Sequence, residues 1–92
     1  MKVFQSNSFA KRVKKLTKND KLELDKIVRL ILENLNIGIE KKGDLTKIFV
    51  YKYKIKTQQY LLAYRFSDIE LELIKIDVHQ NFYRDLKNQI KS

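Results

Sequence analysis

The hydrophobic residues near the start of the chain recur at helical spacing. Phe9, Val13 and Leu16 lie four and three residues apart, and most positions between them are basic. Ser6 or Ser8 precedes this stripe and can accept a hydrogen bond from one of the first free backbone N–H groups of a helix. The segment therefore predicts a short basic helix with one narrow apolar edge.

A stronger helical pattern follows. Asn19 or Asp20 can cap this second helix, and Gly38 can end it in the left-handed backbone conformation. Its apolar residues recur at spacings of three, one, three and four: Leu24, Ile27, Val28, Ile31 and Leu35. The two helices, joined by a tight turn, form a helical hairpin.

Beyond a loop at residues 39–46, the hydrophobic period changes from 3.6 to 2. Apolar and polar residues then alternate over three stretches, which predicts a three-stranded antiparallel meander. Residues 57–59 and Ser67–Asp68 are expected to form its turns. The predicted strands are Ile48–Lys56, Tyr60–Phe66 and Ile69–Val78.

The first predicted strand has one aromatic face and one basic face. The basic face carries Lys52, Lys54 and Lys56, and strand residues two apart lie about 6.6 Å from each other. This spacing is close to that of successive phosphates, so the row of lysines can follow a nucleic-acid backbone. The solvated face of a half-buried strand gives the same pattern, and the row alone does not decide between the two. The helical hairpin must cover the opposite, aromatic face.

These elements predict an α+β fold in one domain that spans residues 1–92. The helical hairpin packs on one face of a small antiparallel sheet, so the helices are expected on that face. Val3–Phe4 can add a short N-terminal edge strand to the three-stranded meander. Phe82, Leu86 and Ile90 lie four residues apart and predict a short C-terminal helix. No proline-rich or low-complexity stretch marks a second domain.

The composition narrows the chemistry. An apolar fraction of 43% indicates a folded protein. The chain has no cysteine and one histidine, too few ligands for a zinc site, and its two glycines cannot build a glycine-rich phosphate loop. We therefore expect no metal and no small-molecule cofactor. No stretch resembles a signal peptide or a membrane span, so a cytoplasmic protein without membrane contact is expected.

The formal net charge of +9 is concentrated in the first part of the chain. Residues 1–56 hold 15 Lys and Arg against 6 Asp and Glu, whereas residues 57–92 hold 5 of each class. Such a field favours a polyanionic partner, either a nucleic acid or an acidic protein. Solubility is the simpler explanation of the same charge.

The one histidine, His79, lies where the third strand ends and the last helix begins, shortly before Tyr83. Cleavage of RNA by its own 2′-hydroxyl needs a base, cations for the developing charge and an acid at the leaving oxygen. Histidine titrates near neutrality, lysines supply charge, and an aromatic ring can hold an unstacked base. The segment therefore suits metal-independent RNA cleavage. A structural, hydrogen-bonding histidine is the alternative.

Five short segments of the chain occur in an order and at a spacing that are typical of one protein family. They are Phe9–Leu16, Gly43–Leu45, Tyr51–Ile55, Tyr60–Tyr64 and His79–Lys87. On these segments the chain resembles RelE/ParE-family toxins of type II toxin–antitoxin systems. The last segment is similar to a ParE-like branch whose members end in His-x-Asn-Phe-Tyr-Arg-Asp-Leu.

The resemblance implies a compact toxin that a cognate antitoxin protein wraps and blocks. RelE-like members cleave mRNA in the ribosomal A site, whereas true ParE members inhibit DNA gyrase on the same scaffold, so the fold does not decide the target. The first hypothesis is a metal-independent, ribosome-associated mRNA endoribonuclease, a hydrolase that stops translation and growth. The alternatives are a non-enzymatic inhibitor of gyrase and a basic RNA-binding domain without toxicity.

Transferred residue by residue, the resemblance implies a catalytic set of Lys52, Lys54, His79 and Tyr83. The two lysines match those that act around the scissile phosphate, His79 matches an acid or base, and Tyr83 matches a nearby aromatic residue. Further candidate RNA contacts are Lys56, Arg65, Phe82 and Arg84.

One position departs from the family pattern. RelE toxins carry arginine directly after the first tyrosine of the middle strand, and here that position is Leu61. The cation for the transition state must then come from elsewhere. Arg65, four residues on and therefore on the same strand face, and Arg84 are the candidates.

Overall fold

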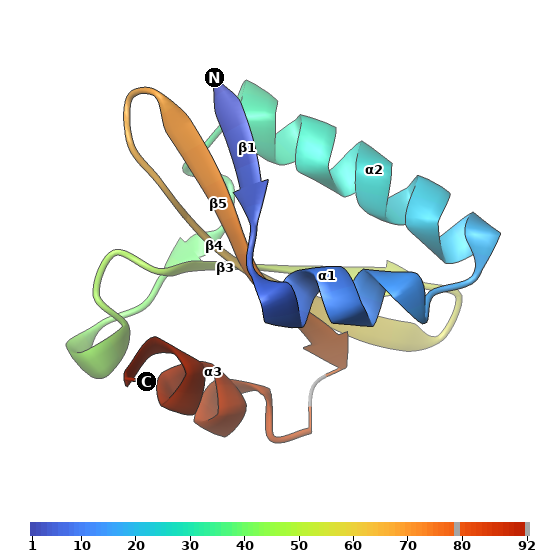
Figure 1. Cartoon of the computed structure of the whole chain (residues 1–92). Helices are drawn as coiled ribbons and strands as arrows, with labels where there is room; N and C mark the ends of the chain where they lie inside the picture. The colour runs from blue at the N-terminus through green and yellow to red at the C-terminus, as the bar shows by residue number, and fades with distance from the viewer. Residues whose placement is uncertain (79, 92) are drawn as a thin grey trace.

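The computed structural model describes residues 1–78 and 80–91, which form a five-stranded sheet with helices on both faces (Figure 1). The strand order is β1-β5-β4-β3-β2. The strands are β1 (Lys2–Gln5), β2 (Ile39–Glu40), β3 (Phe49–Ile55), β4 (Gln58–Phe66) and β5 (Glu70–Val78). The helices are α1 (Asn7–Lys14), α2 (Lys18–Glu33), α3 (Phe82–Lys91) and a single 3₁₀ turn, η1 (Gly43–Leu45). None of the helices in these residues is both long and apolar enough to cross a bilayer.

The predicted α+β fold and the meander are confirmed, but the sheet is mixed rather than antiparallel. β4 pairs antiparallel with β3 and with β5, whereas β1 pairs parallel with β5, so that Lys2 lies opposite Glu70. The predicted edge strand at Val3–Phe4 is thus present. The short strand β2 adds a fifth strand beyond β3. Hydrophobic period does not report pairing direction, which here depends on how the helical hairpin carries the chain from one sheet edge to the other (Figure 1).

The helical hairpin covers one sheet face, as predicted. α1 and α2 pack their apolar stripes against alternate residues of the three meander strands. Burying one such aliphatic or aromatic side chain contributes about 1.5–3 kcal/mol. The buried residues of this core are Phe9, Leu16, Leu24, Ile31, Tyr60, Leu62, Tyr64, Leu71, Leu73 and Ile76.

Side-chain hydroxyls cap both helices of the hairpin. The Oγ of Ser6 accepts a hydrogen bond from the N–H of Phe9 at 3.0 Å, which confirms one of the two predicted caps. The predicted caps of α2 are wrong, because Thr17 is the capping residue and its Oγ1 accepts from the N–H of Asp20 at 3.1 Å. The helix therefore begins earlier than the apolar stripe suggested, since its first turn is polar.

Gly38 does not end α2, contrary to the sequence-based prediction. The helix ends at Glu33, and Gly38 is not among the residues with positive φ. Gly38 instead allows its backbone to approach the side chain of Tyr64 closely. The N–H of Gly38 donates to the Oη of Tyr64 at 2.9 Å, and a Cβ at this position would lie 2.9 Å from the same oxygen.

The expectation that all helices lie on one face is wrong, because α3 packs on the opposite face (Figure 1). The consecutive apolar residues of β4 explain this arrangement. Leu61 and Ala63 alternate with the residues that face the helical hairpin, so a second apolar layer must be covered. The buried residues of this second core are Leu45, Ile48, Val50, Leu61, Ala63, Ile74, Phe82 and Leu86.

The first meander strand is shorter than predicted. β3 ends at Ile55, which pairs with Gln58, and the turn consists of Lys56 and Thr57. Lys56 has a φ of 56°, in the left-handed region that tight hairpin turns require. Gln58 and Gln59 belong to β4 rather than to the turn. Lys56 is therefore not a strand residue.

Candidate nucleic-acid interface

Lys52 and Lys54 lie on the open part of the sheet face that α3 partly covers. Strand residues alternate, so both lysines project to the same side as Val50, which is buried in the core with α3. Both lysine residues are exposed. Lys52 pairs across the sheet with Leu61, and Leu61 is part of that same core. The two ammonium groups therefore border the part of the face that α3 covers.

Lys56 does not continue this row. It lines a hollow of about 400 Å³ together with Thr17, Asn19 and Asp20. These residues cap or begin α2, so the hollow lies at the end of the helical hairpin and not beside α3. The predicted row of three lysines is thus reduced to Lys52 and Lys54.

The two aromatic residues that begin α3 differ in accessibility. Phe82 is 1% exposed, so its ring is buried in the second core, whereas the predicted RNA contact needs a ring that a base can reach. Tyr83 is half-buried, with its ring edge-on to that of Phe82 at a centroid distance of 5.4 Å. His79, the predicted acid or base, lies outside the described residues. Of the predicted aromatic contacts, Tyr83 is the one that solvent reaches.

Lys41 is a cation beside Tyr83 that the sequence patterns did not reveal. Its Nζ lies 5.1 Å from the centroid of the Tyr83 ring. Its backbone N–H donates to the carbonyl of Ile48 at 2.8 Å, which holds this segment against the start of β3. An ammonium group over an aromatic face contributes about 0.5–1 kcal/mol at an exposed site. No periodic pattern marks the loop at residues 39–46, so only the fold brings Lys41 to α3.

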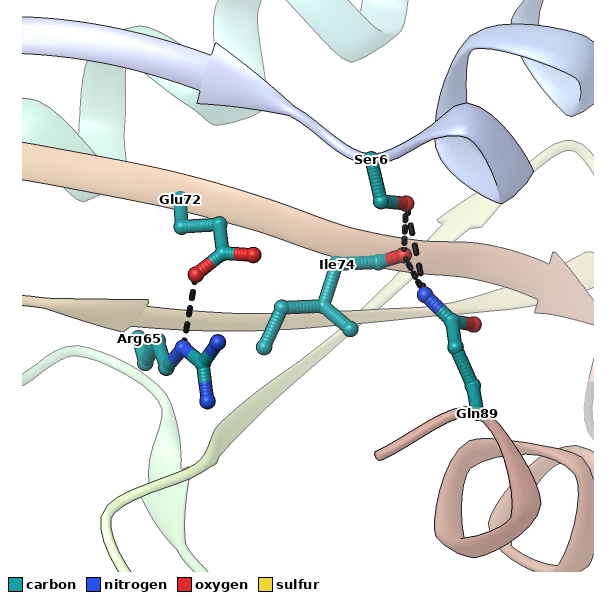
Figure 2. Close-up of polar contacts among 5 residues, drawn as sticks. All are labelled: Ser6, Arg65, Glu72, Ile74 and Gln89. Carbon is teal, nitrogen blue, oxygen red and sulfur yellow. Dashed lines mark hydrogen bonds and ion pairs between the residues drawn. The ribbon is translucent and has the colours of Figure 1, made fainter. Parts of the chain in front are cut away.

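The arginines that were candidates for the missing cation have other neighbours. Arg65 lies four residues beyond Leu61 on β4, about 13 Å along the strand. Its Nε pairs with the Oε1 of Glu72 at 2.6 Å (Figure 2). Arg84 is exposed, and its Nε lies 3.6 Å from the Oδ1 of Asp85. Leu61 itself is 0% exposed. Arg65 is therefore held by Glu72, away from the buried position of Leu61.

Tyr53 lies on the opposite face of β3, behind the two lysines. Burial raises the pKa of its hydroxyl well above the usual value of 10.0, and the negative charges of Tyr60 and Asp20 raise it further. The Tyr53 and Tyr60 rings stack with their centroids 5.6 Å apart. The hydroxyl of Tyr53 stays protonated near neutral pH, and it does not act as a base there.

Acidic side chains do not gather into a metal site in the part of the chain that the structure describes. Among residues 1–78 and 80–91, no three His, Cys, Asp or Glu side chains lie together as metal ligands would. The candidate interface instead consists of lysines and one half-buried tyrosine.

Comparison with known proteins gives a consistent result. The family model of the ParE-like toxin of type II bacterial toxin–antitoxin systems matches residues 3–87. Among curated protein sequences, none matches this chain.

Several solved structures share the fold. A free-state mutant of the E. coli toxin RelE is 18% identical, with a TM-score of 0.72 over 98% of this chain and 94% of that one. The toxin chain matched in the intact E. coli RelBE toxin–antitoxin complex is 20% identical, with a TM-score of 0.69 over 86% of this chain and 96% of that one. The YoeB/ParE toxin from Agrobacterium tumefaciens is 18% identical, with a TM-score of 0.69 over 86% and 99%. At these identities the likeness concerns the fold.

Proposed function

Because this chain belongs to the ParE-like toxin family of bacterial type II toxin–antitoxin systems, we propose that it is a ribosome-associated endoribonuclease that cleaves mRNA without a metal ion. One observation supports this choice of target above the others. Lys52 and Lys54 are exposed, lie two residues apart on β3 and border α3, which carries Tyr83. Two cations on a sheet face that also carries an accessible aromatic ring suit a phosphate and its neighbouring base.

The proposed reaction is an attack of the RNA on itself. The imidazole of His79 takes the proton of the 2′-hydroxyl, and the 2′-oxygen forms a bond to the adjacent phosphorus. Lys52 and Lys54 stabilise the negative charge that develops on the phosphorane oxygens. The bond from phosphorus to the 5′-oxygen breaks, and that oxygen takes up a proton from solvent. The products are a 2′,3′-cyclic phosphate and a 5′-hydroxyl.

The proposal includes an antitoxin as the partner of this toxin. The E. coli relative of the same fold is seen in a toxin–antitoxin complex. A net charge of +9 suits a partner with acidic side chains. Co-expression with the product of an adjacent open reading frame tests this, and the two chains are expected to purify together.

The activity is tested with purified protein in a translating extract. Transcripts are expected to be cut, the 3′ fragments are expected to carry 5′-hydroxyl ends, and His79→Ala is expected to remove most of the cutting. Added antitoxin should protect the transcripts. Intact transcripts in an extract whose translation the protein still inhibits would contradict the proposal. The same holds for intact transcripts with a protein that still arrests growth of cells.

The burial of Leu61 favours a second candidate, a non-enzymatic inhibitor of DNA gyrase. Leu61 is in the core and Arg65 pairs with Glu72, which leaves Arg84 on α3 as the other candidate for the cation expected at this position. A supercoiling assay with purified gyrase separates the two candidates. Inhibition by both the wild type and His79→Ala, without RNA cleavage by either, selects the gyrase inhibitor.

A further inference from the structure

A second basic surface lies away from Lys52 and Lys54. It is a groove of about 380 Å³ between α1 and the end of β5. The side chains that matter for its chemistry come from both walls: Ser8, Lys11, Arg12, Lys15, Lys75 and Asp77. Neither the proposed cleavage chemistry nor the two lysines of β3 use this groove.

The groove carries an excess of positive charge. Arg12 and Asp77 pair with each other, since the Nε of the arginine lies 3.2 Å from the Oδ1 of the aspartate. Within residues 1–78 and 80–91, no carboxylate pairs with Lys11, Lys15 or Lys75. Three ammonium groups therefore remain unneutralised around one groove. Concentrated charge of one sign in a concave surface attracts an anionic partner more strongly than the same charges spread apart.

The spacing of the lysines suits a chain of phosphates. Lys11 and Lys15 are four residues apart at the end of α1, so they lie on one side of the helix, about 6 Å apart along its axis. This is close to the separation of successive phosphates on an extended strand. Lys75 of β5 also lines the groove, and its Nζ lies 5.9 Å from the centroid of the Phe82 ring of α3. A strand that runs along the groove meets Lys11 and Lys15 on α1 and passes the edge of β5 that carries Lys75.

Both walls of the groove are held in place. The Oγ of Ser6, directly before α1, donates to the carbonyl of Ile74 at 2.5 Å, and the Nε2 of Gln89 on α3 donates to the same carbonyl at 2.9 Å (Figure 2). The Arg12–Asp77 pair ties α1 to the end of β5. The lysines therefore project from backbones that are fixed relative to each other, so binding need not order the walls.

The chemistry of the groove fits a nucleic acid better than a peptide. Protein partners usually anchor through apolar side chains in apolar pockets. None of the exposed large apolar residues in the described part of the chain lines this groove. These residues are Met1, Val3, Phe4, Leu22, Leu30, Leu32, Ile39 and Ile69. Contacts with phosphates require only well-placed cations.

We infer that the groove between α1 and β5 binds the phosphate backbone of an RNA strand and is a second RNA contact surface of this toxin. The choice of RNA as the polyanion rests on the proposed function. The groove holds RNA through charge and not through base edges, so its contribution is the same for different sequences and falls as the salt concentration rises.

Binding is measured by fluorescence anisotropy with a labelled 2′-O-methyl RNA, which lacks the attacking hydroxyl and is not cleaved. The double variant Lys11→Glu/Lys15→Glu is expected to bind roughly tenfold more weakly at about 0.1 M salt, with a salt dependence less steep by about 1.4 units. Lys11→Gln/Lys15→Gln should show a smaller loss in the same direction. Thermal unfolding of each variant verifies that it is folded.

The matched control is Lys21→Glu/Arg29→Glu, which makes the same change in net charge at exposed positions of α2 outside the groove. It is expected to weaken RNA binding less than threefold. Equal losses in the two double reversals would mean that only net charge matters and would overturn the inference. It is equally overturned if the groove reversal leaves RNA binding intact and abolishes binding of the antitoxin.

The test of RNA binding by the groove can be separated from the test of RNA cleavage. Groove-dependent binding of the non-cleavable RNA by a protein that cuts no transcript keeps this inference and rejects the proposed activity. Cleavage of transcripts together with RNA binding that ignores the groove reversal does the opposite.

Discussion

The hydroxyl of Tyr64 and the backbone N–H of Gly38 lie 2.9 Å apart, which joins the middle strand of the sheet to the connection that follows α2. The same hydroxyl donates to the carbonyl of Leu35 at 2.7 Å. One fully buried side chain thus satisfies two backbone groups of this connection. The bond sets where the chain enters β2 and, through it, the loop that places Lys41 beside Tyr83.

Substitution of Gly38 tests this close approach. In Gly38→Ala the new Cβ would lie 2.9 Å from the Oη of Tyr64 and 3.1 Å from the backbone oxygen of Val50, which cannot move without the strand. We expect the free energy of unfolding in urea to fall by about 1–3 kcal/mol. An unchanged denaturation midpoint would show that the connection moves away freely.

Removal of two buried tyrosine hydroxyls should change the free energy of unfolding to different extents. Tyr64→Phe leaves the carbonyl of Leu35 and the N–H of Gly38 without this partner, and we expect a loss of about 1–3 kcal/mol in the free energy of unfolding. Tyr53→Phe is the matched control, because the buried Oη of Tyr53 has no hydrogen-bond partner among the described residues. Its stability is expected to be unchanged or slightly higher. A larger loss in Tyr53→Phe than in Tyr64→Phe would contradict this assignment.

The same two tyrosines predict alkaline instability. Burial raises the pKa of Tyr53 and of Tyr64 above the usual value of 10.0, whereas in the unfolded chain both hydroxyls ionise near that value. The stability from their neutral forms is therefore fully present below about pH 10 and is lost as the pH rises above it. Urea denaturation at a series of pH values should show this decline. Tyr53→Phe should make it less steep, and an identical slope would refute the role of Tyr53.

The lysines of β3 should differ in their effect on RNA cleavage. Lys52→Ala and Lys54→Ala are each expected to lower the cleavage rate roughly 10- to 100-fold, because each removes a charge that stabilises the transition state. Lys56→Ala removes the same charge from the β3–β4 turn, and we expect a change of less than threefold. Cleavage rates of the three variants, measured in the translating extract, test this difference. Equal losses for all three lysines would indicate that the whole row binds RNA.

Local pattern predicted most of the fold. The apolar stripes gave both helices of the hairpin, and alternation gave the three meander strands, because helices and strands that bury one face must repeat with their own periods. The run Tyr60–Tyr64 also carried a signal that was not used. Five consecutive apolar residues in a strand indicate burial on both faces, and this accounts for α3 on the second face.

Less of the candidate site than of the fold could be predicted from the sequence. Alternation along β3 was enough to put Lys52 and Lys54 on one face, because side chains of neighbouring strand residues must point in opposite directions. It could not show that the strand ends before Lys56, since that depends on the pairing of β3 with β4. The accessibility of Tyr83, the burial of Phe82 and the approach of Lys41 arise where α3 meets the sheet and the β2–β3 connection. Contacts between residues so far apart in the chain depend on how the elements pack, and no local period of the sequence records them.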